Sequence, residues 1–112
     1  MDQERKRELR RQAREFKPQM GVVSFTCEAT GDVFFATAKN VPAYLNRTRL
    51  QAETGTLRNK RLQELWRAHG EDAIAYDVVE DLDYEDGVTD YTDDLGVLLE
   101  ECLAAHPEAS RL

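Results

Sequence analysis

The sequence of 112 residues lacks any apolar run that approaches the roughly 20 residues needed for a membrane-spanning helix. It is charged from Asp2 onward and lacks the apolar segment of a secretory signal, so we expect a cytoplasmic protein that does not contact membranes. It has only two cysteines, Cys27 and Cys102, without CxxC spacing. We expect buried free thiols, and a disulfide or a metal pair is the alternative.

Basic residues are almost missing from the second part of the chain. Residues 70–112 contain one Arg against fourteen acidic residues, whereas residues 1–69 contain fourteen Lys and Arg against eight acidic residues. A basic surface is therefore available only in the first part, and the second part should repel polyanions. Solvated charged faces explain both parts most simply. The alternative for the acidic segment 77–94 is a docking surface for a basic protein partner.

Recognisable metal-binding spacings are also lacking. His69 has no second histidine three or four residues away, as a metal pair on a helix would require. The acidic stretch 81–90 lacks the glycine and glutamate positions of a calcium loop. We therefore expect no metal ion and no other cofactor, and we expect this stretch to be a solvated loop.

A hairpin is the clearest local pattern that is present. Val23, Phe25 and Cys27 alternate with polar residues, which predicts a half-buried strand. A second extended run covers residues 33–38, and Gly31 in the connection can supply the positive φ of a tight turn.

The remaining segments predict helices and one more strand. Apolar residues with helical spacing indicate helices over residues 2–17, 40–55, 59–69 and 92–106. A third strand is expected over 73–82, with a bulge or the strand's end where Val79 breaks the alternation. The basic first helix is either an ordinary surface helix or an arm that contacts phosphates. Trp66 is expected to be a core anchor, with base stacking as the alternative.

Short motifs spread over nearly the whole chain resemble one family. They are Lys17-Pro18-Gln19-Met20-Gly21-Val22-Val23, the run FFATAKN at 34–40, Asn46-Arg47, Gly55, Asn59-Lys60, Leu62-Gln63, Trp66, Gly70-Glu71-Asp72 and Asp90-Tyr91-Thr92. In this order they are similar to short stand-alone bacterial members of the GIY-YIG nuclease superfamily. The resemblance implies an α/β (α+β) domain with a three-stranded antiparallel sheet flanked by helices. We expect a basic N-terminal helix at 1–18, the GIY-YIG-like domain at 19–106 and a tail at 107–112.

The resemblance also implies an active site that hydrolyses DNA phosphodiesters at one divalent metal. Such a site uses two tyrosines, an arginine, a histidine and a metal-binding glutamate. Here Val23 and Phe34 stand at the tyrosine positions, Tyr44 at the arginine position, Thr48 at the histidine position and Leu99 at the glutamate position. The groups that would stabilise charge and move protons are therefore replaced.

Helical periodicity supports the assignment of Leu99. It shares an inward stripe with Leu95 and Cys102, whereas Glu100 is rotated by about 100° and should face solvent. If the alignment shifts by one residue, Glu100 takes the glutamate's role. We expect Leu99 to pack against Val23 and Phe34 and so to fill the cleft. A small apolar ligand pocket is the alternative.

We therefore expect a non-catalytic domain that acts by binding a nucleic acid or a protein partner. Candidate nucleic-acid contacts are Arg47, Arg49, Arg58, Lys60 and Arg61. Binding to DNA should be weak and should fall steeply with salt. The competing hypothesis is an endonuclease with a rearranged site of Tyr44, Arg47 and Glu100, which would require Mg²⁺ or Mn²⁺.

Overall fold

The computed structural model describes residues 17–112, which form a four-stranded sheet with the order β3-β1-β2-β4. The central hairpin consists of β1 (Gly21–Cys27) and β2 (Val33–Ala38). On one side β3 (Ile74–Asp81) pairs antiparallel with β1, and on the other β4 (Ala109–Arg111) lies parallel to β2. The helix predicted over 2–17, and with it the proposed segment 1–18, lies almost wholly outside the described residues.

The turn of the hairpin forms as its glycine predicts. Gly31 has a φ of 80°, and its amide donates to the carbonyl of Cys27 at 2.7 Å. The amide of Cys27 donates in turn to the carbonyl of Asp32 at 2.8 Å. A side chain at position 31 would be strained at this φ, so the glycine allows the two strands to pair directly.

Three helices follow their expected start and stop signals. They are α2 (Val41–Thr54), α3 (Lys60–His69) and α4 (Thr92–Ala105). The side chain of Asn40 accepts from the amide of Ala43 at 3.2 Å, and Asn59 accepts from that of Leu62 at 2.9 Å. These N-caps satisfy amides that have no partner within the helix.

The predicted irregularity in the third strand is a bulge at Val79. In the pairing of β1 with β3, Val22 lies opposite Glu80 and Val23 lies opposite Val78. Val79 is therefore the extra residue, at the position where it breaks the alternation of apolar residues.

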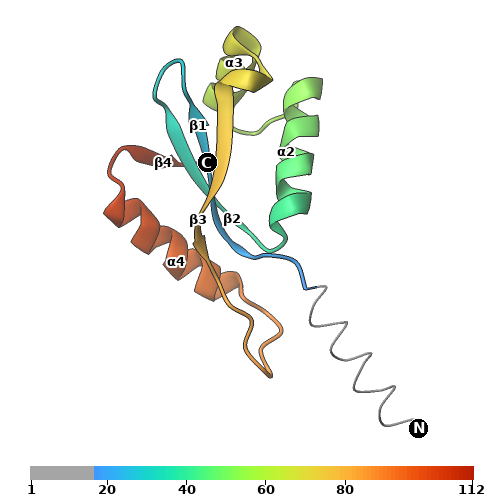
Figure 1. Cartoon of the computed structure of the whole chain (residues 1–112), viewed down its shortest axis with the longest axis vertical. Coiled ribbons are helices and arrows are strands. Elements are labelled where there is room, and N and C mark those ends of the chain that lie inside the picture. The colour runs from blue at the N-terminus through green and yellow to red at the C-terminus, as the bar shows by residue number, and fades with distance from the viewer. Residues whose placement is uncertain (1–16) are drawn as a thin grey trace, which may run out of the picture.

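Helices cover the sheet on both sides, so the core has two layers (Figure 1). On the side of α2 and α3, here called the α2/α3 face, the core includes Val23, Phe25, Cys27 and Phe34. On the opposite α4 face, Val22 and Phe35 pack with Leu99 and Cys102. The two cysteines are buried and free, as expected, and they lie in different layers.

Two expectations about the end of the chain need correction. The sheet has a fourth strand, and residues 107–112 are not a tail, because 109–111 form β4. The amide of Leu112 donates to the carbonyl of Phe35 at 2.9 Å, and its side chain packs against the core of the α2/α3 face. A three-residue strand is too short to show a period of two, so no pattern in the sequence predicts it.

The acidic loop between β3 and α4 is anchored by its tyrosines. The hydroxyl of Tyr84 donates to the carbonyl of Pro18 at 2.7 Å, and the rings of Tyr84 and Tyr91 meet edge to face. Tyr91 also packs with Met20 and Leu95 in a small third cluster. The loop is thus attached to the start of β1, although most of its residues are exposed. None of the helices described within residues 17–112 is long and apolar enough to cross a membrane.

Candidate functional site

The two positions that match the family's tyrosines lie inside the core. Val23 is fully buried and Phe34 is 5% exposed, and both belong to the α2/α3 face. Strand alternation explains their common direction, because the residues that β1 and β2 point to one face recur at every second position. Neither side chain offers a group that could bind water or a phosphate.

The two matching positions on α2 lie next to this core. Tyr44 packs against it, with its ring centroid 6.3 Å from that of Phe25. Burial raises the pKa of Tyr44. Thr48 is buried, and its hydroxyl donates to the carbonyl of Tyr44 at 2.8 Å. The hydroxyl of Thr48 is therefore occupied within the helix. The charge of Arg47 and a side-chain hydrogen bond with Thr48 act against the effect of burial on the pKa of Tyr44.

Leu99 does not lie with these residues. It packs on the α4 face with Val22 and Phe35, so our expectation that it contacts Val23 and Phe34 is wrong. The physical reason is that adjacent residues of a strand point to opposite faces of the sheet, and α4 covers the face opposite α2.

The rearranged site is not assembled either. Glu100 is exposed on α4 and pairs with Arg111 of β4. Tyr44 and Arg47 lie on α2, across the sheet. The structure therefore brings Tyr44 and Arg47 together, with the guanidinium of Arg47 5.5 Å from the ring centroid of Tyr44, but keeps Glu100 apart from them.

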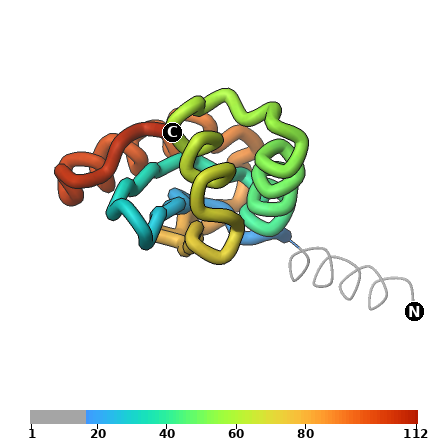
Figure 2. Tube along the Cα trace, turned by 90° about the horizontal axis from the view of Figure 1, so that it is seen from above, coloured from blue at the N-terminus to red at the C-terminus, as the bar shows by residue number. Residues whose placement is uncertain are grey.

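The five basic residues proposed as nucleic-acid contacts do not form one cluster. Arg47 and Arg58 line a common groove of about 430 Å³ between α2 and the α2–α3 connection, here called the Arg47 groove. Its lining also includes Tyr44, Thr48, Asn59 and Leu112. Figure 2 shows the end of the chain beside this connection. Lys60, the first residue of α3, is exposed next to the groove.

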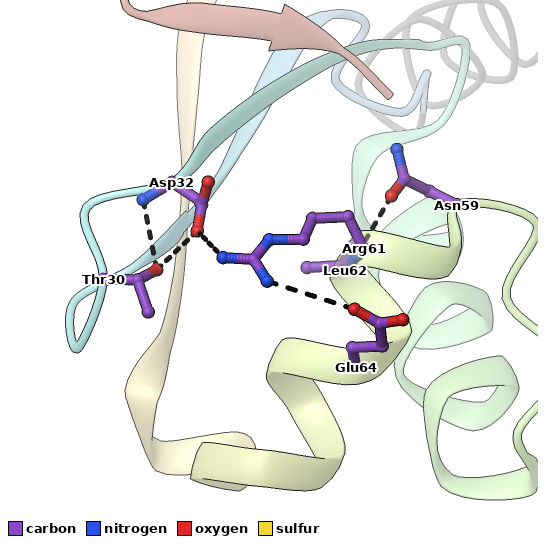
Figure 3. A network of polar contacts seen from close by, with 6 residues as sticks. All are labelled: Thr30, Asp32, Asn59, Arg61, Leu62 and Glu64. Atoms are coloured by element: carbon purple, nitrogen blue, oxygen red, sulfur yellow. Dashed lines mark hydrogen bonds and ion pairs between the residues drawn. The ribbon is translucent and has the colours of Figure 1, made fainter.

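Arg61 joins α3 to the hairpin turn instead (Figure 3). Its guanidinium donates to the carboxylate of Asp32 at 2.9 Å and lies 4.0 Å from Glu64. The hydroxyl of Thr30 donates to the same carboxylate at 2.6 Å. The bond from Thr30 and, after it, the one from Arg61 lower the pKa of Asp32.

Arg49 is also engaged by carboxylates. Its guanidinium lies 4.0 Å from Glu53 and 3.8 Å from Glu71, on the side of α2 away from Arg47. The basic set thus divides into Arg47 and Arg58 in one groove, the exposed Lys60 next to it, and two arginines that form ion pairs elsewhere.

Comparisons of sequence find no matching family model and no similar curated protein. Solved structures with a similar fold include the catalytic domain of the homing endonuclease I-TevI, with a TM-score of 0.67 and 16% identity over 83% of this chain and 97% of that one. A mutant of the catalytic domain of the intron endonuclease I-TevI has a TM-score of 0.62 and 19% identity over 80% of this chain and 82% of that one. The chain has a GIY-YIG-like fold. At these identities the likeness concerns the fold alone.

The residues of this GIY-YIG-like domain do not fit the divalent metal that the resemblance implies. The five matched positions carry no carboxylate, and their oxygen donors are the hydroxyls of Tyr44 and Thr48. Hard divalent cations prefer several carboxylate, carbonyl or water oxygens in one place. Among residues 17–112, no group of three His, Cys, Asp or Glu side chains could hold a metal ion.

Sequence reasoning missed one residue that positions the Arg47 groove. Gln63 is buried in α3; its amide nitrogen donates to the carbonyl of Ala52 at 2.9 Å, and its oxygen accepts from the amide of Leu57 at 3.2 Å. These bonds hold the α2–α3 connection that carries Arg58. The only signal was that Gln63 belongs to the pair Leu62-Gln63, one of the short motifs that resemble the family.

Proposed function

We propose that this GIY-YIG-like domain is not a nuclease and that it binds nucleic acid through phosphate contacts in the Arg47 groove. The observation that carries the proposal is the burial of Val23 and Phe34 at the tyrosine positions. Packed hydrocarbon there leaves no room for the attacking water or for a proton-transfer group. The fold neighbours are catalytic domains of an endonuclease, a class of enzyme that acts on nucleic acid.

The two groove arginines differ from the other arginines in what surrounds them. Arg47 and Arg58 are exposed, and neither forms an ion pair within the part of the chain that the structure describes. Arg47 stacks on Tyr44, which orders the guanidinium while its donors remain available. Unpaired arginines can neutralise phosphates and release counterions, whereas paired ones must first lose a carboxylate.

Charge also restricts the direction of approach. The acidic residues are concentrated after residue 70, in β3, the following loop and α4. A polyanion is therefore expected to approach from the α2–α3 connection, where Lys60 adds a third cation.

The test compares two double variants that remove the same charge. Arg47→Ala/Arg58→Ala should weaken binding of a labelled duplex by about tenfold or more, and the matched control Arg49→Ala/Arg61→Ala by much less. With about two phosphate contacts, wild-type affinity should fall roughly tenfold between about 50 and about 200 mM salt. Fluorescence anisotropy with duplex and single-stranded probes measures both effects.

Three results would contradict the proposal. Equal losses in the two double variants would indicate general electrostatic attraction instead of a groove. An absence of binding at both salt concentrations would remove nucleic acid and favour a protein partner. Plasmid nicking by the pure protein with Mg²⁺ or Mn²⁺, lost in Glu100→Ala, would restore the endonuclease hypothesis.

A further inference from the structure

The sheet ends at β3 on one side and at the short β4 on the other. Among the described strands, β3 pairs with β1 alone, and with eight residues it forms the longer of the two edges (Figure 1). An open edge presents backbone donors and acceptors that another chain can use.

The pairing with β1 determines which residues of β3 direct their backbone groups outward. The amide of Glu28 donates to the carbonyl of Ala73 at 2.9 Å, so Ala73 faces β1. Since hydrogen-bonded and non-bonded pairs alternate in an antiparallel ladder, Ala75 also bonds to β1, and the backbone groups of Ile74 and Tyr76 point away from it. Val78 follows the same alternation, just before the bulge.

Two backbone amides on this outer edge already have hydrogen-bond acceptors within the chain. The amide of Ile74 donates to the carbonyl of Glu71, and the amide of Val78 donates to the side chain of Asp77 at 2.8 Å. Within residues 17–112, the amide and carbonyl of Tyr76 and the carbonyls of Ile74 and Val78 have no such partner. One donor and three acceptors therefore remain, centred on Tyr76.

An apolar hollow adjoins this part of the edge. It has a volume of about 260 Å³ and lies between β3, α2 and α3, with Phe25, Leu45, Trp66, Ile74 and Tyr76 in its lining. The side chain of Tyr76 is 61% exposed, although it lies opposite the buried Phe25 of β1. The Arg49–Glu71 ion pair contributes to the rim. A residue paired with Tyr76 would direct its side chain to the same face and so into this hollow.

The charges around the edge favour a basic ligand. Asp72 precedes β3, and Asp77, Glu80 and Asp81 lie within it, while no Lys or Arg occurs between residues 70 and 110. Carboxylates on an edge strand repel acidic segments and attract lysine and arginine.

We propose that the edge of β3 is a docking site for an extended, basic segment of another protein. The segment adds a strand beside β3, places one apolar side chain opposite Tyr76 in the hollow, and sets lysines or arginines near the carboxylates. Backbone hydrogen bonds supply affinity and the hollow supplies specificity, as in other cases of strand addition. This site is separate from the Arg47 groove, because the two use opposite sides of α2.

The test uses a labelled set of seven-residue peptides, Lys-Val-Lys-Xaa-Lys-Val-Lys, with Phe, Leu, Ile, Trp or Gly at the centre. We expect an apolar centre to bind at least about tenfold more tightly than Gly, since one buried aromatic or aliphatic side chain contributes about that much. N-methylation of the central residue should abolish binding while the charge stays constant. Hydrogen exchange should show protection of the Tyr76 amide when peptide is bound.

Matched variants distinguish binding of the peptide at the β3 edge from general electrostatic attraction to the protein. Tyr76→Ala should weaken binding of the Phe peptide about tenfold, and Val97→Ala, which removes an equally exposed apolar side chain from α4, should leave it unchanged. The proposal is overturned if no peptide binds, if the N-methylated peptide binds as well as its parent, or if the centre makes no difference. Duplex binding by the same variants should not change, which keeps this test independent of the Arg47 groove.

Discussion

The two faces of the sheet differ in the grooves that open on them. On the α4 face, Leu99 and Cys102 pack on Val22 and Phe35, and partly buried side chains surround these four residues. On the α2/α3 face, Tyr44, Leu45 and Trp66 are only partly buried, and both the Arg47 groove and the apolar hollow open there.

This difference separates structural positions from candidate binding positions. Four of the five positions that match the family's site lie on the α2/α3 face. The fifth, Leu99, lies on the α4 face. The apolar residues Val23 and Phe34 therefore lie on a face that also carries exposed cations and rings, whereas Leu99 packs on the opposite face.

The largest expected effect comes from Leu99→Glu, which would disrupt the apolar packing of Leu99 with Val22 and Phe35 on the α4 face. A carboxylate buried without a partner should reduce the free energy of unfolding by about 3–5 kcal/mol, or prevent folding. Glu100→Leu on the exposed neighbouring position is the control and should change it by less than about 0.5 kcal/mol. Urea denaturation, followed by circular dichroism, measures both. Recovery of the Leu99→Glu variant by Mg²⁺ would show that this position can hold a metal and would contradict the view that it contributes packing alone.

A smaller effect is expected on the more open face from Gln63→Ala. The carbonyl of Ala52 and the amide of Leu57 would lose their partner, at a cost of about 1–3 kcal/mol in the free energy of unfolding. Because the same bonds hold the segment that carries Arg58, duplex affinity should fall too. The control is Gln51→Ala, which shortens another glutamine in the lining of the same groove. Destabilisation without any change in affinity would show that the α2–α3 connection does not need Gln63 to present Arg58.

Local signals predicted most of the fold. The caps at Asn40 and Asn59, the turn glycine at 31 and the bulge at Val79 each depend on chemistry within a few residues, so the sequence carries them directly. The strand β4 depends on pairing with β2, whose residues lie 76 positions earlier, and its three residues contain no pattern.

The candidate site was predictable only where the signal was a direction within one element. The alternation of apolar residues correctly predicted that Val23 and Phe34 are buried, and the helical period correctly predicted the burial of Leu99. However, a sheet covered on both sides has two inward directions, and periodicity cannot tell them apart. The ion pairs of Arg49 with Glu71 and of Arg61 with Asp32 could not be predicted from local patterns, because the partners are distant in sequence.

The smallest expected effects concern acid sensitivity at the two faces. Hydrogen bonds from Thr30, and then from Arg61, lower the pKa of Asp32 beside α3, and those from Thr92 lower the pKa of Asp90 at the start of α4. A carboxyl whose pKa is lower in the folded state stabilises the fold above its unfolded pKa, and this contribution is lost as the pH falls through the folded pKa. Asp32→Asn and Asp90→Asn should therefore each narrow the gap between the Tm at pH 7 and at pH 2.

The carboxylate of Asp90 is exposed and that of Asp32 is partly exposed, so each change in Tm should be no more than about 3 °C at low salt and smaller at high salt. A scanning calorimeter resolves such shifts, and the control is Asp93→Asn, at an exposed position in the first turn of α4. If Asp32→Asn narrows the gap and Asp90→Asn does not, the ion pair between hairpin and α3 is the acid-sensitive contact, and the α2/α3 face should open first as the pH falls. The reverse result would place the weaker contact at the start of α4, and the apparent openness of the α2/α3 face would then not reflect lower stability.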